Sequence, residues 1–191
     1  MPGERRSKWS LEMKVKRVVT GRNETGESVF VSVTDAPCTH DYEHIPGMSI
    51  TQLWSTSASP RLPRAVEDPT TSTSSIVPGP GGTQFMIVAF PPDQIMTSPS
   101  FNAMAAVEEN IRHAPGLAEK FEVASPGMHT TDTIDYGIVL KGEIWLELDR
   151  GKTEQLRSGD VVVQNGTRHA WRNRGATTAL VAFVMIGADR A

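Results

Sequence analysis

The amino-acid sequence predicts an all-β protein, an antiparallel sandwich or small barrel with one main helix. Short runs rich in β-branched and aromatic residues recur along the chain, and in its second half turn residues separate them at even spacing. That spacing favours a sandwich or barrel over alternating strands and helices. The strands are predicted at Val15–Thr20, Ser28–Thr34, Ser49–Trp54, Gln84–Phe90, Tyr136–Leu140, Ile144–Leu148, Asp160–Gln164, Ala170–Arg172 and Thr178–Ile186.

The helix is predicted over Phe101–His113. Apolar residues recur there at helical spacing, at Phe101, Met104, Val107 and Ile111. Ser100 is a suitable N-cap, and Pro115 and Gly116 end the pattern.

One domain is expected over residues 1–191, because a chain of 191 residues can bury a sizeable core and shows no internal repeat. Within it we expect a basic tail at 1–12, a long surface loop at 55–82 that is dense in Ser, Thr, Pro and Gly, and a barrel core at 117–187. The N-terminal strands at Val15–Thr20 and Ser28–Thr34 are additions to this barrel.

Composition excludes several classes of partner. The formal net charge is −3, which provides no basic field for a nucleic acid. We find no apolar segment of the length that a membrane span or a signal peptide needs, so no membrane association is expected. Cys38 is the only cysteine, which suits a reducing compartment, and a cytoplasmic location is expected.

Two stretches concentrate residues that can bind a metal ion. In GMHTTDTIDYG, His129, Thr131, Thr133 and Asp135 occupy alternate positions, so a strand would place them on one face. In GDVVVQNGTRHAWRN, the turn at Asn165 and Gly166 leads to His169 and Trp171. A hairpin of this kind can direct His169 into a barrel.

These two stretches resemble the conserved motifs of the cupin superfamily, G-x5-H-x-H-x3,4-E-x6-G and G-x5-P-x-G-x2-H-x3-N. His129, Asp135 and Gly142 fall on the first motif. The positions that fall on the second motif are Gly159, Gly166, His169 and Asn173. The resemblance covers about a third of the chain and implies a single-domain jelly-roll barrel.

The chain departs from the family pattern at the metal site. Thr131 stands in place of the second histidine of the first motif, and Asp135 in place of its glutamate. His129, Asp135 and His169 remain, which is the composition of a site with two histidines and one carboxylate for iron, manganese or zinc. The alternative is a metal-free barrel in which both histidines are hydrogen-bonded pocket groups.

The remaining candidates are weaker. Thr131, Thr133 and Trp171 are possible substrate-pocket residues, but threonine is an ordinary strand residue and tryptophan an ordinary core residue. Asp132 is an alternative carboxylate ligand that alternation places on the opposite face from His129. His40 and His44 are expected in a surface turn.

Two functions are consistent with these residues. The first is a metal-dependent enzyme, such as a lyase, decarboxylase, isomerase or dioxygenase, that acts on a small organic acid or a phenolic or ketonic metabolite. The second is a module that binds or senses a small ligand without chemistry. A homodimer is also expected, because the N-terminal strands offer open edges and the resemblance implies pairing.

Overall fold

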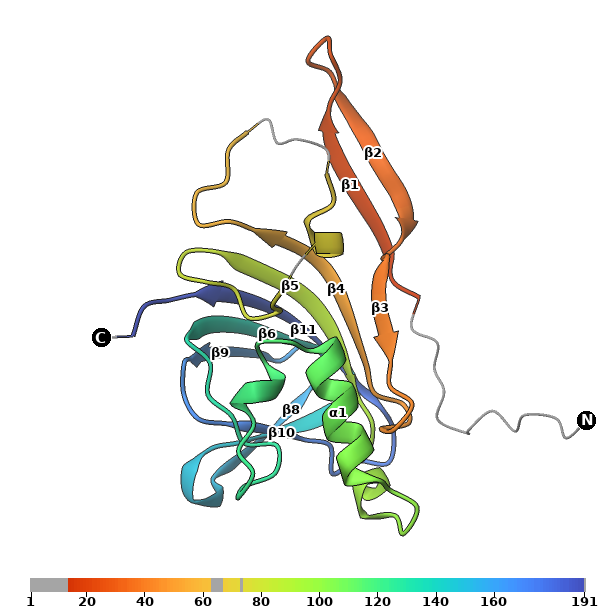
Figure 1. Cartoon of the computed structure of the whole chain (residues 1–191), viewed down its shortest axis with the longest axis vertical. Coiled ribbons are helices and arrows are strands. Elements are labelled where there is room, and N and C mark those ends of the chain that lie inside the picture. The colour runs from red at the N-terminus through yellow and green to blue at the C-terminus, as the bar shows by residue number, and fades with distance from the viewer. Residues whose placement is uncertain (1–13, 63–66, 73, 191) are drawn as a thin grey trace, which may run out of the picture.

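The computed structural model describes residues 14–62, 67–72 and 74–190 (Figure 1). Nearly all of its regular structure is antiparallel β-sheet, in sheets of six, three and two strands. The six-stranded sheet, in spatial order, consists of β3 (Cys38–Asp41), β4 (Ser49–Thr56), β5 (Thr83–Phe90), β11 (Ala179–Gly187), β6 (Thr133–Lys141) and β9 (Val161–Asn165). The three-stranded sheet consists of β10 (Ala170–Arg172), β7 (Glu143–Glu147) and β8 (Thr153–Arg157).

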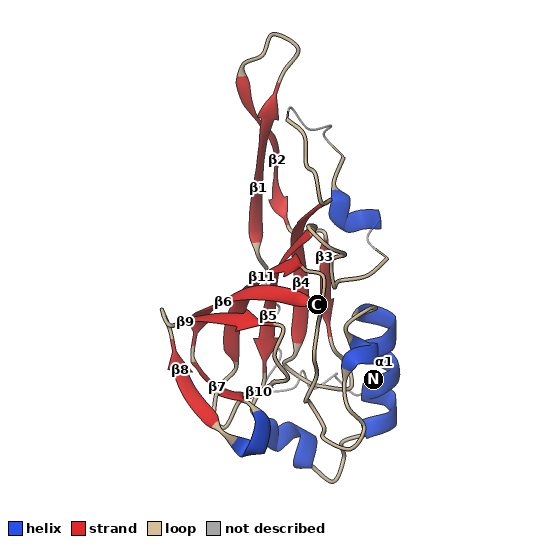
Figure 2. Ribbon diagram, turned by 90° about the vertical axis from the view of Figure 1, so that its left-hand side faces the viewer, coloured by secondary structure: helices blue, strands red, loops and turns tan. Residues whose placement is uncertain are grey.

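These two sheets enclose the main core (Figure 2). Ile144 and Leu156 of the three-stranded sheet share one buried cluster with Val139, Val181 and Phe183 of the six-stranded sheet. From Thr133 to Leu140 burial alternates along β6, so one face of the strand lines the interior and the other points outward. The predicted all-β barrel class is therefore confirmed.

Gly142 makes the tight connection from β6 to β7. Its φ is +78°, and a side chain there would approach the backbone of Ala179 to 3.1 Å. Only glycine combines that backbone conformation with so close an approach. This explains why a glycine stands at the position that falls on the closing glycine of the family motif.

The strands β1 (Lys16–Arg22) and β2 (Ser28–Asp35) form a separate hairpin that projects from the body (Figures 1 and 2). We call this hairpin the arm. It carries its own two-stranded ladder and hydrogen-bonds to neither of the larger sheets as a strand. The predicted basic tail at 1–12 lies outside the described residues.

All nine predicted strands are present, each with ends within three residues of those expected, whereas β3 and β8 were not predicted. Both missed strands are short and polar, with the sequences CTHD and TEQLR. Each contains only one β-branched residue, a threonine, and no aromatic residue, so the signal on which the prediction depends is weak. Pairing with β4 and β7, not local propensity, makes them strands.

The main helix, α1 (Ala103–His113), begins two residues later than predicted. Asn102, and not Ser100, is the N-cap, since its side chain accepts a hydrogen bond from the backbone N–H of Ala105. The apolar residues at helical spacing are also not its buried face: Met104, Val107 and Ile111 are exposed, and Ala106 and Glu109 are buried. Short 3₁₀ turns occur at Pro69–Ser72, Asp93–Thr97, Ala118–Lys120 and Asp149–Gly151.

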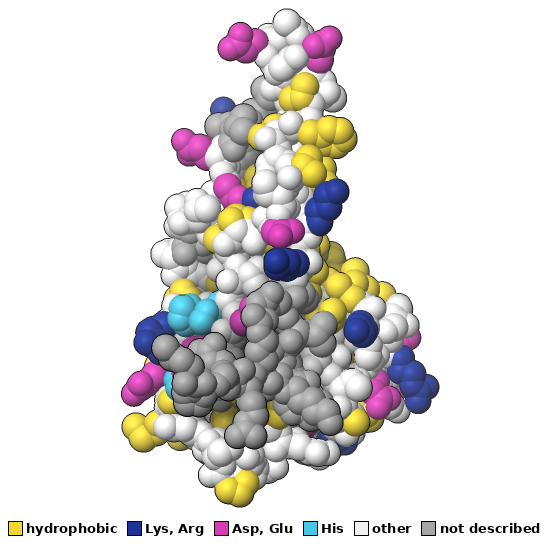
Figure 3. Space-filling model, turned by 90° about the vertical axis from the view of Figure 1, so that its right-hand side faces the viewer, with side chains coloured by type: hydrophobic (Ala, Val, Ile, Leu, Met, Phe, Trp, Pro, Cys, Tyr) yellow, Lys and Arg dark blue, Asp and Glu magenta, His cyan; other side chains and the backbone are white. Residues whose placement is uncertain are grey.

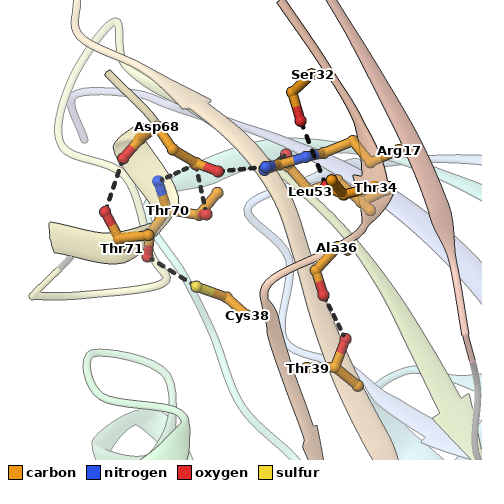
Figure 4. A network of polar contacts seen from close by, with 10 residues as sticks. All are labelled: Arg17, Ser32, Thr34, Ala36, Cys38, Thr39, Leu53, Asp68, Thr70 and Thr71. Atoms are coloured by element: carbon orange, nitrogen blue, oxygen red, sulfur yellow. Dashed lines mark hydrogen bonds and ion pairs between the residues drawn. The ribbon is translucent and has the colours of Figure 1, made fainter. Parts of the chain in front are cut away.

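The described part of the 55–82 segment is packed more closely than a surface loop. Ile76 and Thr70 are buried, and Ile76 belongs to the main core. Asp68 pairs with the Arg17 guanidinium of β1 and accepts hydrogen bonds from the backbone and hydroxyl of Thr70 (Figure 4). Thr70 and Ile76 are thus buried within a segment expected at the surface, because a run of polar residues does not show which of its side chains find partners.

Candidate functional site at one end of the barrel

His129 and His169 lie side by side on neighbouring backbone segments. Their main chains exchange two hydrogen bonds, of 2.9 and 3.0 Å, and their ring centroids are 4.3 Å apart. Both side chains are buried. The two motif histidines, 40 positions apart in the sequence, therefore form one pair.

Each imidazole is oriented by a backbone carbonyl two residues before it. The Nδ1 atom of His129 is 3.1 Å from the Gly127 carbonyl oxygen, and that of His169 is 2.9 Å from the Thr167 carbonyl oxygen. A carbonyl oxygen only accepts, so Nδ1 carries the proton and Nε2 presents a lone pair. Among the described residues, neither Nε2 atom has a hydrogen-bond partner.

Both histidines are neutral near pH 7. Burial lowers the pKa of His129, an effect that its hydrogen bond to Gly127 and the Glu122 carboxylate only partly offset. Burial and the neighbouring His129 lower the pKa of His169 to about 4. Neutral imidazole is the form that binds a metal ion or accepts a proton from a substrate.

Asp135 faces the barrel interior from β6. It is buried, and its Oδ1 atom has no hydrogen-bond partner. Burial raises the pKa of this carboxyl, and the Thr133 hydroxyl opposes the shift only in part. A buried carboxylate oxygen without a partner is costly and marks a place where a ligand or cation would be stabilised.

Thr131 and Thr133 are fully buried, and their hydroxyl oxygens are 2.8 Å apart. The hydroxyl groups therefore satisfy each other in part. Their position between His129 and Asp135 along the same segment is the one that alternation predicted.

Two buried glutamines that the sequence analysis did not identify lie in the same row of the sheet as Asp135. The strand register places Gln164 of β9 opposite Asp135, and Met185 of β11 on its other side opposite Gln84 of β5. Gln84 and Gln164 are buried, and Gln84 donates to the side chain of Gln52. The sequence signal that could have identified these residues is a glutamine at an inward-facing position of an otherwise apolar strand.

Aromatic rings close the site on two sides. The Phe121 ring centroid is 4.7 Å from that of His129, and the Trp171 ring meets His169 edge-on at 6.1 Å. Trp171 also packs against Phe183 and the main core. It is thus both a core residue and a neighbour of the histidine pair, whereas nothing in the sequence distinguished Phe121.

His129, His169 and Asp135 are residue types that bind metal ions, but their side chains do not surround a common point. Two imidazoles with free Nε2 atoms and a buried carboxylate with a free oxygen are suitable donors for iron, manganese or zinc. Yet within residues 14–62, 67–72 and 74–190 no three His, Cys, Asp or Glu side chains lie close enough together to hold a metal ion. A three-ligand site at His129, Asp135 and His169 stays a prediction.

The other polar candidates serve different purposes. Asp132 is exposed and pairs with Arg190, as expected for the face opposite His129. His40 lies in β3, not in a turn, and its Nε2 atom is 2.9 Å from Glu109 Oε1. Its ring also stacks on that of His113 at 3.4 Å. The Cys38 Sγ atom is 3.3 Å from the Thr70 carbonyl oxygen.

A separate cavity of about 290 Å³ lies outside the histidine pair, next to the turn at Asp149–Gly151. Arg150, Arg168 and Arg172 line it. Arg168 is paired with Glu122 and Asp149, and Arg172 with Glu147, so most of this positive charge is neutralised within the protein.

The described chain contains no helix long and apolar enough to cross a membrane.

Comparison with known proteins places the same segment in a known family. Residues 119–186 match the model of the cupin domain. The phomopsin biosynthesis cluster protein C' of Diaporthe leptostromiformis is 60% identical over 50 residues, which are 26% of this chain and 26% of that protein. The cupin-domain-containing oxidoreductase virC of Hypocrea virens is 49% identical over 51 residues, 27% of this chain and 26% of that protein.

The chain therefore aligns with about a quarter of the length of these two curated relatives. Among solved structures, a cupin 2 conserved barrel domain protein from Salinispora arenicola is 15% identical, with a TM-score of 0.38. That alignment covers 74% of this chain and 77% of the other.

Proposed function

The chain belongs to the cupin superfamily through the domain at residues 119–186, and on that premise we propose that it is an enzyme that converts a small metabolite at the end of its barrel. The observation that carries the proposal is the pair His129 and His169. Two buried, neutral imidazoles are held by their Nδ1 atoms so that both Nε2 lone pairs remain available. A purely structural pair of core histidines would be expected to use both nitrogens in hydrogen bonds.

The reaction class that we propose is a redox conversion of a small organic acid or a phenolic or ketonic metabolite. Relatives whose names describe cupin-domain-containing oxidoreductases, and others named for biosynthesis clusters, support this choice. A lyase, decarboxylase or isomerase reaction would use the same residues. A cytoplasmic location is part of the proposal, in keeping with the single cysteine, Cys38.

We further propose that His129 and His169 are ligands of a divalent iron, manganese or zinc ion, with Asp135 as the third ligand. When bound, such an ion supplies a Lewis acid that polarises a carbonyl or carboxylate group, and iron can in addition activate oxygen. The protein's own groups provide the rest. Thr131 and Thr133 offer hydroxyls to orient the substrate, and the rings of Phe121 and Trp171 exclude water.

The second candidate is a barrel that binds a small ligand without catalysis. It is favoured by Thr131, which replaces a histidine of the motif, and by the lack of a gathered three-residue ligand group in the described chain. In this case the free Nε2 atoms and the Asp135 carboxyl would be hydrogen-bonding groups for the ligand.

One experiment separates the two candidates. Protein purified without chelator is analysed for metal, then screened with phenolic aldehydes, ketones and small acids for thermal shifts and, under air, for mass changes in the added compound. Stoichiometric metal with turnover that is lost in both His129→Ala and His169→Ala supports the enzyme. Thermal shifts without metal or turnover support the binder, and neither shifts nor turnover with any compound would refute both.

A further inference from the structure

The cavity of about 290 Å³ beside the turn at Asp149–Gly151 lies directly behind the histidine pair. Met128 and Arg168 line it, and each directly precedes one histidine of the pair. The backbones of His129 and His169 are bridged as in an antiparallel ladder, and successive side chains of extended backbone point to opposite faces. The imidazole rings and the cavity are therefore on opposite sides of the same short ladder.

Most of the cavity lining is of two kinds, three guanidinium groups and three apolar side chains. They belong to Arg150, Arg168, Arg172, Pro126, Met128 and Leu148. On the face of the molecule seen in Figure 3, Lys and Arg side chains are instead spread along the arm and the body. Guanidinium groups beside apolar surface suit a small organic acid, because paired N–H groups can bind its carboxylate while the apolar wall shields its carbon skeleton from water.

Arg168 and Arg172 differ in what they can offer a ligand. All three nitrogen atoms of the Arg168 guanidinium donate to carboxylates of the protein. Arg172 donates from Nε to Glu147 at 2.6 Å, and its Nη1 and Nη2 atoms have no hydrogen-bond partner among the described residues. Nη1 lies close to Gly127, where a Cβ atom would be only 2.8 Å away. Protein contacts thus hold Arg172 in place and leave its terminal N–H groups available.

Arg150 is held in an unfavourable backbone conformation. Its φ is +59°, and no other described residue except glycine has a positive φ. Such a conformation is unfavourable for a residue with a Cβ atom, and glycine or asparagine is its usual occupant. Within the described chain, the Arg150 side chain makes no hydrogen bond or ion pair that would offset this cost. Strain of this kind is typical of functional positions, and here the side chain lines a cavity.

Net charge is not what this cavity offers an anion. Three carboxylates balance the three arginines, two of them paired with Arg168 and one with Arg172. What remains is a set of N–H groups, the terminal ones of Arg172 and the whole guanidinium of Arg150. Because solvent and salt weaken the attraction between exposed charges, recognition here depends on direct contact with these N–H groups.

From these observations we propose that the cavity is a binding site for a small organic acid, whose carboxylate lies between Arg150 and Arg172 and whose carbon skeleton lies on the apolar wall. A volume of about 290 Å³ is at the low end of the range for small-molecule sites, roughly 300–1,000 Å³, so the acid is small. This site is separate from the histidine pair and does not depend on the reaction proposed there.

The test is a titration with phenylacetate, followed by NMR of isotope-labelled methionine methyl groups. Met128 lines the cavity, whereas Met185 lies opposite Asp135 in the sheet, so the two signals distinguish the cavity from the barrel interior. Met128→Leu and Met185→Leu assign them. Phenylacetate should shift the Met128 signal in a saturable way, and its neutral analogue phenylacetamide should not.

Three results of this titration would overturn the proposal. The first is a Met128 signal that phenylacetate does not shift, with or without a shift of Met185. The second is an equal effect of phenylacetamide, which would mean that the carboxylate is not recognised. The third is displacement of phenylacetate by an equal concentration of inorganic phosphate, which would mean that the apolar wall contributes nothing and that the ligand is not an organic acid.

Variants of the two arginines test the contacts. Arg172→Gln should weaken binding about 10-fold, and Arg150→Asn about 5-fold, because the Arg150 side chain is more exposed. Arg150→Asn should at the same time raise the melting temperature by about 2 °C, since asparagine adopts the left-handed conformation more readily. A binding site that costs stability predicts these opposite effects of one substitution.

Arg157→Gln is the matched control, since it removes the same charge from the other end of the β7–β8 hairpin. It should leave the affinity unchanged. Circular dichroism establishes that each variant is folded, and Arg150→Asn decides the matter if Arg172→Gln does not fold. An Arg150→Asn variant that binds phenylacetate like the wild type, or an equal loss of affinity in Arg157→Gln, would contradict a site between Arg150 and Arg172.

Discussion

The imidazole rings of His129 and His169 are 4.3 Å apart, and each is fixed by a hydrogen bond from Nδ1 to the backbone carbonyl two residues before it. The symmetry of the two arrangements means that both rings present the same atom, Nε2. Because burial lowers the pKa of both side chains, the rings can remain this close without charge repulsion. The predictions about the site start from this pair.

His129→Ala and His169→Ala should each lower metal affinity by at least roughly 100-fold, since each removes one of the proposed ligands and loss of an outer-shell partner already costs 10–100-fold. Thr131→Ala should leave the metal bound, because a neutral hydroxyl is a poor ligand. Metal content of the purified variants, determined side by side, is the measurement. His44→Ala is the control, and a similar loss of metal in that variant would argue against a specific site.

Asp135→Asn should reduce metal content, because it removes the anionic ligand, and Asp135→Glu should preserve or increase it, because it restores the side chain of the family motif. Asp132→Asn is the control next to it in sequence. The Asp132 carboxylate pairs with Arg190 on the surface, so its loss should leave the metal content unchanged. If Asp132→Asn lost metal and Asp135→Asn kept it, the assignment of the carboxylate would be incorrect.

The sequence was sufficient for those parts of the molecule that depend on local periodicity and on motif spacing. Alternation along 129–135 correctly separated Asp135, which is buried, from Asp132, which is exposed. His129 and His169, the two histidines that fall on the family motifs, lie side by side in the structure. Whether Asp135 joins the two histidines around a metal depends on side-chain positions that a pattern of residue types does not contain.

Long-range contacts explain what was missed. The helix α1 buries Glu109 and exposes Val107, the reverse of what its apolar periodicity indicates. Glu109 is inside because its carboxylate accepts hydrogen bonds from the backbone N–H groups of Glu43 and His44. These residues are 65 and 66 positions away, so no local pattern could indicate the contact.

Glu109→Gln should therefore lower the free energy of unfolding by about 3 kcal/mol. Its carboxylate accepts from two backbone N–H groups and lies 2.9 Å from His40 Nε2. A glutamine amide would turn an N–H group toward one of these donors and leave it buried without a partner. Urea denaturation measures the change. Glu108→Gln, at an exposed neighbouring position, should change stability by no more than about 0.5 kcal/mol, and equal effects in both variants would contradict this role for Glu109.

The ion pair between Asp68 and Arg17 should make the free energy of unfolding depend on pH in the acidic range. Burial raises the pKa of Asp68, but hydrogen bonds from Arg17 and Thr70 outweigh it and hold the pKa at about 2, below the ordinary value of 3.8. A carboxyl whose pKa is depressed by folding stabilises the protein above its unfolded pKa, and this contribution is lost as the pH falls through the folded pKa. It should thus be complete above about pH 5 and disappear between about pH 4 and 2.

The comparison that isolates this contribution is wild type against Asp68→Asn, by urea denaturation at several pH values. At pH 7 the wild type should be more stable by at most about 2 kcal/mol, because the pair is partly exposed and solvent weakens it. The difference should shrink steadily below pH 4, as protonation makes the wild-type side chain neutral like asparagine. Glu154→Gln, at an exposed position on β8, should show no such convergence. A difference between wild type and Asp68→Asn that stays constant from pH 7 to pH 2.5 would mean that Asp68 acts through its shape and not through its charge.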